Sequence, residues 1–172
     1  MVYSKEHILK IRLAEAIDEQ ELIQLIAKFR QSLAQLRGKV SNMDLASAKK
    51  ELSGYQEREF PIYVAESDAE RVIGYLVCRV DENVVWAESL FVSAEYRRQG
   101  IGTSLYAEAE HLAQELGKDT PYNWVDPNNT AIIRFLQKRG YSVLNLIELR
   151  RTRSGEKMTN KICVGTNEFD YY

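Results

Sequence analysis

Residues 97–102 read Arg97-Arg98-Gln99-Gly100-Ile101-Gly102, and this stretch decides how the chain folds. They follow the apolar run 84–92, which is typical of a β-strand, and they precede the helix-like stretch 103–116. A strand that turns through glycines into a helix leaves backbone N–H groups unpaired at the positive end of the helix dipole. Such a turn binds phosphate groups, and the two arginines add positive charge.

Other phosphate-binding motifs do not fit this turn. A dinucleotide fingerprint needs a third glycine where the chain has Leu105, and a P-loop needs a Gly-Lys-Ser/Thr sequence that the chain lacks. For the hexapeptide alone a second interpretation stays open, in which the glycines only allow tight packing at a helix entrance. The surrounding sequence is therefore needed to distinguish an anion-binding turn from a turn whose glycines only allow close packing.

A second motif supports the anion site. The hexapeptide resembles the Arg/Gln-x-x-Gly-x-Gly/Ala acetyl-CoA motif of the GCN5-related N-acetyltransferases (the GNAT superfamily), and residues 88–96 resemble the strand and turn that lead into it. Residues 129–141 resemble the second signature of that family, which is an Asn, a short helix and a Gly-aromatic pair that opens a strand. The two signatures occur in the family's order, and the resemblance extends from about Ile8 to Val164.

The resemblance implies a mixed α/β fold with a central, mostly antiparallel sheet of about seven strands, flanked by four helices and splayed at the cofactor-binding gap. Residues 1–172 are expected to form a single N-acetyltransferase domain. Periodicity and turn residues predict the same order of elements, with Asp18 and Glu21 as a capping box at the first helix. The expected strands are 8–13, 61–66, 71–80, 84–92, 120–125, 141–149 and 158–164, and the expected helices are 18–38, 41–55, 103–116 and one that follows the turn at 126–129.

Composition excludes several classes of protein. The 172 residues are 45% apolar and 28% charged, which is an ordinary globular balance, and the net charge of −2 gives no general attraction to nucleic acid or to acidic membranes. No stretch is long and apolar enough to span a bilayer, and the first residues lack the apolar core of a signal peptide. Cys78 and Cys163 lack metal-ligand spacing, so we expect reduced, mostly buried thiols in a cytoplasmic protein without a metal site.

The resemblance also implies the residues of a coenzyme site. Main-chain N–H groups of Gln99, Gly100, Ile101, Gly102 and Thr103 would hold the pyrophosphate of acetyl-CoA, and Arg97 and Arg98 would add charge. The pantetheine arm would lie like an extra strand against Leu90, Phe91 and Val92, in a gap where residues 120–125 splay away. A bulge near Leu90 or Phe91 would direct one N–H at the thioester carbonyl, and Asn129 would contact the arm.

Two residues are candidates for proton transfer. A solvated primary amine has a pKa of about 10.4, so a base or a desolvating pocket has to supply its neutral form. Glu88 lies beside the expected thioester and is either this base or a solvent-facing strand residue. Leu136 stands where many family members have a Tyr that protonates the leaving thiolate, so either another group serves or the thiolate leaves unaided and takes a proton from water. Among the other groups, Tyr122 on the neighbouring strand is a better candidate than Tyr141.

Three functions are to be distinguished for these residues. The first is an N-acetyltransferase that uses acetyl-CoA to acetylate a primary amine of a small molecule or peptide by direct attack in a ternary complex. The second, which Leu136 keeps open, is an acetyl-CoA-binding module with little or no transfer. The third, a nucleic-acid-binding domain, conflicts with the acidic net charge. Trp124 either packs in the core or lines the acceptor groove, and a homodimer through the final strands is plausible.

Overall fold

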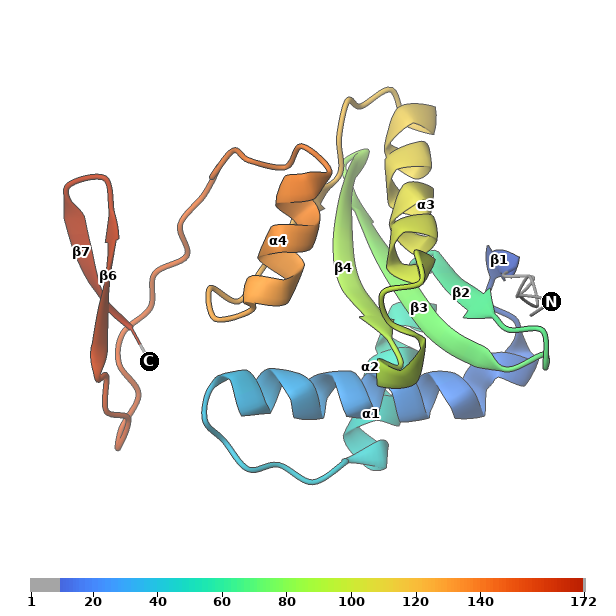
Figure 1. The fold of residues 1–172 in the computed structure, drawn as a ribbon, viewed down its shortest axis with the longest axis horizontal. Helices are drawn as coiled ribbons and strands as arrows, with labels where there is room; N and C mark the ends of the chain where they lie inside the picture. The colour runs from blue at the N-terminus through green and yellow to red at the C-terminus, as the bar shows by residue number, and fades with distance from the viewer. Residues whose placement is uncertain (1–9, 172) are drawn as a thin grey trace, which may run out of the picture. The chain divides into compact units, whose positions relative to one another are not determined.

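The computed structural model describes residues 10–171 and divides the chain into two compact units, one that ends at Asp126 and one that begins at Pro127. The first unit contains a five-stranded sheet in the order β1-β2-β3-β4-β5, which Figure 1 shows. Its strands are β1 (Lys10–Leu13), β2 (Ile62–Glu66), β3 (Val72–Asp81), β4 (Val84–Val92) and β5 (Tyr122–Asn123). Strands β1 to β4 run antiparallel to their neighbours, and β5 runs parallel to β4.

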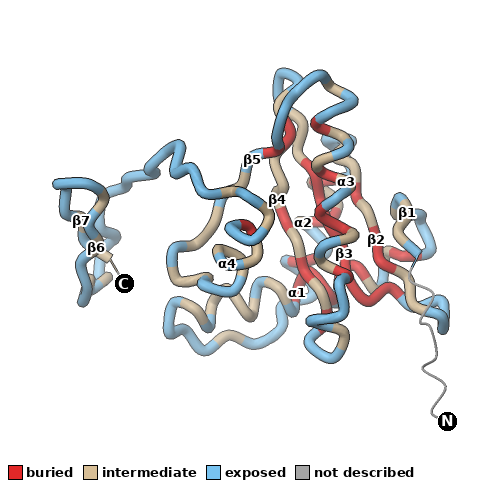
Figure 2. The backbone as a smooth tube through the Cα atoms, turned by 45° about the horizontal axis from the view of Figure 1, so that its top comes forward, coloured by how far each residue is buried: buried red, intermediate tan, exposed pale blue. Residues whose placement is uncertain are grey.

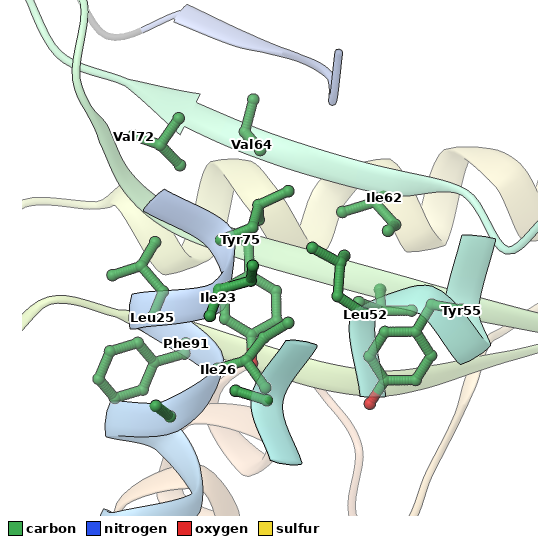
Figure 3. Close-up of a cluster of buried hydrophobic side chains, with 14 residues drawn as sticks. Ile23, Leu25, Ile26, Leu52, Tyr55, Ile62, Val64, Val72, Tyr75 and Phe91 are labelled. Atoms are coloured by element: carbon green, nitrogen blue, oxygen red, sulfur yellow. The ribbon is translucent and has the colours of Figure 1, made fainter. Parts of the chain in front are cut away.

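Helices cover both faces of this sheet. Helices α1 (Glu19–Leu36) and α2 (Leu45–Glu57) pack on one face and α3 (Ile101–Glu115) packs on the other (Figure 1). Figure 3 shows the core on the α1/α2 side, where Ile26, Leu52 and Tyr75 meet between helix and strand. Figure 2 shows that the buried residues gather where these helices meet the sheet. The predicted three-stranded meander is confirmed as β2, β3 and β4.

The second unit contains α4 (Thr130–Lys138) and the two-stranded sheet of β6 (Asn160–Val164) and β7 (Asn167–Tyr171). With four α-helices in the described residues and a mostly antiparallel main sheet, the expected mixed α/β class is confirmed. The seven strands of residues 10–171 are shared between two sheets and do not form one. None of the helices in residues 10–171 is long and apolar enough to cross a membrane.

The start of α1 differs from the expected capping box. The Asp18 side chain does not cap α1; one of its oxygens accepts a hydrogen bond from Glu15 N at 2.8 Å and forms an ion pair with Arg12 at 2.7 Å. This hydrogen bond from Arg12 keeps the pKa of Asp18 below its usual value. Glu21 instead accepts from Val72 N at 2.9 Å, so it joins α1 to the sheet. The sequence pattern was right about the helix and wrong about the partners, because Asp18 bonds to the nearby Glu15 N and Arg12 before the helix, and Glu21 bonds to Val72 N of β3.

Other differences concern where the second helix begins and which of the expected strands find a partner. The second helix begins at Leu45, because the Asp44 side chain caps it through Ser47 N at 2.9 Å. The strand expected at 120–125 is reduced to Tyr122–Asn123. Residues 141–149 form no strand, because a strand exists only through pairing and β6 pairs with β7 in this unit. The final hairpin turns at 165–166, where Gly165 has a φ of 61°, and the expected tip at 150–155 is a turn between unpaired segments.

The two cysteines differ in burial. Cys78 in β3 is fully buried, and this burial raises the pKa of its thiol to about 12. Cys163 in β6 is exposed, so the expectation of a mostly buried thiol was wrong for it. Its neighbours Ile162 and Val164 are the half-buried residues of the strand, and alternation directs Cys163 to the other face.

Candidate functional site

The turn between β4 and α3, which we call the glycine loop (residues 97–102), begins after a short 3₁₀ turn at Ala94–Tyr96. Arg98 has a φ of 66° and Gly100 a φ of 84°, so both lie in the left-handed region. Gly100 is the N-terminal cap residue of α3 but offers no side chain to cap the helix. A glycine is needed here because a side chain at this φ is strained.

The main-chain N–H groups of this loop are available for a ligand. The first helical hydrogen bond of α3 runs from Ser104 N to Gly100 O at 3.0 Å. Within residues 10–171, the N–H groups of residues 98–103 have no hydrogen-bond partner. Residues 98–100 are exposed, and no atom lies within 4 Å of a Cβ built on Gly100. Bare amides in successive left-handed turns at a helix N-terminus form an anion-binding concavity.

The two arginines of the loop have different environments. The Arg97 Nε donates to Val92 O at 2.8 Å, and its guanidinium lies 5.2 Å from the centroid of the Phe91 ring. Arg97 therefore fixes the turn onto the end of β4. Both side chains are exposed, but Arg98 does not make the contacts that hold Arg97, so its side chain is the better placed to reach a bound phosphate.

Toward its Val92 end, the outer edge of β4 carries main-chain N–H groups that have no partner among the described residues, while Val92 O accepts from Arg97 Nε. Val92 lies opposite Gly74, and Ser93 N donates to Ile73 O at 2.9 Å, so Val92 and Gly74 form a non-hydrogen-bonded pair. By alternation, Leu90 and Val92 direct N–H and C=O away from β3, whereas Phe91 directs its groups toward β3. Strand β5 pairs with β4 only at Trp86 and Ala87. The outer edge from Leu90 to Val92 therefore has no strand partner among the described residues.

A β-bulge lies in the middle of β4, but not at Leu90 or Phe91 as expected. Val77 pairs with Ser89 and Cys78 pairs with Ala87, so Glu88 is the extra residue. The bulge changes which side chains face α3: Val85 and Ala87 do so before it, and Leu90 and Val92 after it. The bulge could not be located from the sequence, because β4 has apolar residues on both faces and so shows no clear apolar/polar alternation.

The side chain of Glu88 forms an ion pair with Arg79 of β3. Its Oε2 lies 3.3 Å from Arg79 Nε, and its side chain is 27% exposed. Arg79 Nη1 forms a second ion pair with Asp81 Oδ2 at 2.5 Å, while Arg79 Nη2 is buried with no hydrogen-bond partner in the structure. Glu88 is therefore a half-exposed carboxylate that an adjacent guanidinium holds in place. Sequence reasoning missed Arg79, since nothing in the local pattern reveals its pairing across β3 and β4.

Three aromatic rings surround this ion pair. The Trp86 ring lies 5.3 Å from Tyr122 and 5.1 Å from Trp124, and we call these three residues the aromatic shelf. The Arg79 guanidinium is 4.9 Å from the ring centroids of both tryptophans. Trp124 is 66% exposed and Tyr122 37% exposed, so the prediction that Trp124 packs in the core is wrong. The Tyr122 hydroxyl has no hydrogen-bond partner among residues 10–171.

Buried polar groups lie under the same face of the sheet. The hydroxyl of Tyr75 and the Oγ of Ser89 are 2.8 Å apart in the core. The Tyr55 hydroxyl donates to Glu51, which also pairs with Arg30. Burial raises the pKa of both tyrosines well above the usual value, so neither ionises near neutral pH. Their hydroxyls are structural hydrogen-bonding groups and not bases.

The remaining candidates lie in the second unit. The Asn129 side chain accepts a hydrogen bond from Ile132 N at 3.3 Å and so caps α4. Leu136 is buried, and Tyr141 N donates to Leu136 O at 3.1 Å, which closes the helix at Gly140. The Arg150 guanidinium forms an ion pair with Glu156 at 2.7 Å, and this hydrogen bond lowers the pKa of Glu156 to about 2.

Comparisons with known proteins agree on one family. The Acetyltransferase (GNAT) family model matches residues 27–141, about two thirds of the chain. Among solved structures, an acetyltransferase of the GNAT family from Staphylococcus aureus is 19% identical with a TM-score of 0.62, covering 77% of this chain and 83% of that one.

Two further structures share the fold. The aminoglycoside N-acetyltransferase AAC(6')-Iy in complex with CoA is 15% identical with a TM-score of 0.67, over 88% of this chain and 99% of that one. The PaiA N-acetyltransferase from Thermoplasma acidophilum in complex with coenzyme A is 21% identical with a TM-score of 0.65, over 76% of this chain and 87% of that one. No curated protein sequence matches the chain.

Proposed function

The chain belongs to the GNAT family of acetyltransferases, and from this membership we propose that it is an N-acetyltransferase that acetylates a primary amine of a small molecule or peptide. The transfer takes place directly, with donor and acceptor bound together. Acetyl-CoA is the acetyl donor of this family, and it supplies the acetyl group as an activated thioester. The observation that supports the proposal most strongly is the run of partnerless N–H groups at residues 98–103.

The residues present fit the coenzyme. The N–H groups of Gln99, Gly100, Ile101, Gly102 and Thr103 are the donors for its pyrophosphate, and Arg98 adds charge. The free outer edge of β4 offers N–H groups at Leu90 and Val92 for the pantetheine arm, as a neighbouring strand would use them. The side chain of Phe91 is buried in the core. Its main-chain groups face β3, so Phe91 has no N–H group directed at the arm. Asn129 is kept as a candidate for the arm, through the side-chain amide group that does not cap α4.

Glu88 is the proposed base. Its carboxylate takes the proton of the acceptor ammonium, directly or through a water molecule, and so provides the neutral amine. Arg79 orients this carboxylate through the 3.3 Å contact. The bulge places Glu88 at the point where β5 leaves β4, two residues from the free N–H of Leu90. A main-chain donor at such a point stabilises developing negative charge on a carbonyl oxygen by roughly 3 kcal/mol.

Tyr122 is the proposed proton donor to the leaving thiolate. The residue is 37% exposed, and its ring centroid lies 5.3 Å from that of Trp86. Leu136, at the place of the usual family tyrosine, cannot donate a proton. A Tyr122→Phe variant is therefore expected to lower turnover while leaving coenzyme affinity unchanged.

The test has two measurements on the full chain. Calorimetric titration with CoA measures binding, and release of free thiol from acetyl-CoA over a panel of primary amines measures transfer. Binding together with amine-dependent thiol release supports the transferase. Binding without thiol release on the whole panel favours the coenzyme-binding module, and absence of any binding heat overturns both.

A further inference from the structure

The aromatic shelf is an unusual surface for a strand edge. Trp124 is 66% exposed and Tyr122 37% exposed, and both lie against Trp86 within 5.3 Å between ring centroids. Single exposed apolar residues are ordinary, but three contiguous aromatic rings beside an ion pair are typical of a recognition surface. The sheet order places this surface at the β5 edge, opposite the β1 edge.

The place that a ligand cation would take on these rings is already occupied. The Arg79 guanidinium lies 4.9 Å from the centroids of Trp86 and Trp124, which is a cation–π distance to each. This guanidinium holds both rings in position before any ligand arrives. A ligand on the exposed side of Trp124 therefore meets a pre-organised aromatic surface, which favours another ring over a second cation.

The charges around the shelf favour an ammonium group nearby. Arg79 carries one positive charge, and its two ion-pair partners, Glu88 and Asp81, carry two negative charges, so the group has a net charge of −1. Glu88 directly follows Ala87, the last residue of β4 that pairs with β5. A ligand whose ring rests on the shelf thus has its charged end beside the proposed base and the free edge of β4.

We propose that the acceptor is a primary arylalkylamine, with its ring against the aromatic shelf and its amino group toward Glu88. This inference rests on the proposed N-acetyltransferase function and adds the chemical class of the acceptor. A polyamine would need several carboxylates spaced along a groove, whereas the shelf offers one excess negative charge.

The experiment measures thiol release from acetyl-CoA with 2-phenylethylamine, n-butylamine, spermidine and glucosamine. We expect the highest kcat/KM for 2-phenylethylamine. In Trp124→Ala, the ratio of kcat/KM for 2-phenylethylamine over n-butylamine should fall about three- to tenfold, and Trp124→Phe should restore most of it. The matched control is Ile17→Ala, which removes a side chain that is 84% exposed in the turn after β1 and should leave the ratio unchanged.

The outcomes separate the two proposals. A preference for spermidine or glucosamine, or an equal loss for both simple amines in Trp124→Ala, would overturn the arylalkylamine and leave the transferase standing. Absence of thiol release with all four amines would overturn the arylalkylamine, whereas the transferase falls only if the wider panel of primary amines, peptides included, also releases no thiol.

Discussion

The two ends of β4 present different kinds of groups to a ligand. At the Val92 end, the chain offers main-chain groups: the glycine loop leaves the N–H groups of residues 98–103 without partners. At the Trp86 end, side chains provide the surface: a guanidinium, a carboxylate and three aromatic rings that come from β3, β4 and the segment around β5. The bulge at Glu88 separates the two ends.

The main-chain end and the side-chain end of β4 should therefore respond differently to substitution. An end built from main-chain groups accepts any side chain that keeps the backbone conformation and leaves room for the ligand. An end built from side chains changes its ligand when one residue changes. We therefore expect substitutions at the loop to alter coenzyme affinity, and substitutions near Trp86 to alter turnover or acceptor choice.

The largest expected effect is on kcat and concerns Glu88, the bulge residue between the two ends of β4. Glu88→Gln removes the proposed base but keeps the shape of the side chain, so kcat for amine acetylation should fall by on the order of 100-fold. The dissociation constant for CoA should stay the same, because the loop is unaltered. The matched control is Asp81→Asn, which removes the other carboxylate that pairs with Arg79. An equal fall in both variants would show that Glu88 acts through the ion pair and not as a base.

The next largest effect concerns the loop. Gly102→Asp places a carboxylate in the first turn of α3, where a built Cβ meets only Val92 at 3.9 Å. The carboxylate suits the helix dipole, so stability should not fall, yet it repels a diphosphate and occupies its donors. We expect CoA affinity to drop about 10- to 100-fold, the value of one lost hydrogen bond to a charged group.

Calorimetry with CoA and thermal unfolding of the same samples check this expectation together. Gly102→Ala is the control, since it adds the Cβ without the charge. Unchanged CoA affinity in Gly102→Asp would mean that the loop does not hold the coenzyme.

A third effect tests the packing that sets the position of the loop. A Cβ on Gly74 would lie 3.0 Å from Phe91 O and 3.3 Å from Leu105 Cδ1, and the backbone oxygen cannot yield easily. Gly74→Ala should therefore lower the free energy of unfolding by about 1–3 kcal/mol. Gly54→Ala, inside α2 with only the end of the Arg58 side chain at 3.7 Å, should raise it by about 0.5–1 kcal/mol.

Urea denaturation of the two variants measures both changes. Opposite signs are the expected result. A Gly74→Ala variant as stable as the unaltered chain would show that β3, β4 and α3 are packed less tightly than the structure indicates.

The sequence revealed one end of β4 much better than the other. The glycine loop was predictable because its information is local: two glycines, a preceding strand and a following helix stand in one short stretch. The Trp86 end was not, because Arg79 meets Trp86 only through the register of β3 with β4, and Trp124 meets both only through β5. For the same reason the bulge was expected two or three residues too late. The strand expected at 141–149 failed because pairing, and not apolar pattern, decides whether a strand forms.

The smallest expected effect is the loss of stability at high pH that the buried thiol of Cys78 causes. Cys78 pairs with Ala87, beside the bulge, and burial raises the pKa of its thiol from 9.0 to about 12. Because the folded pKa is the higher one, the unfolded chain releases this proton first, and stability is lost as pH rises above 9. The loss should reach about 1 kcal/mol at pH 10.

Urea denaturation at pH 8 and at pH 10 measures this loss, and Cys78→Ala is the reference that lacks the thiol. The buried tyrosines begin to contribute near pH 10, but they contribute equally to both proteins, so the difference between the two isolates Cys78. We expect the unaltered chain to lose about 1 kcal/mol more than Cys78→Ala over this interval. An equal loss would mean that water reaches the Cys78 thiol in the folded protein, and hence that the core between α3 and the sheet is packed less tightly than the structure indicates.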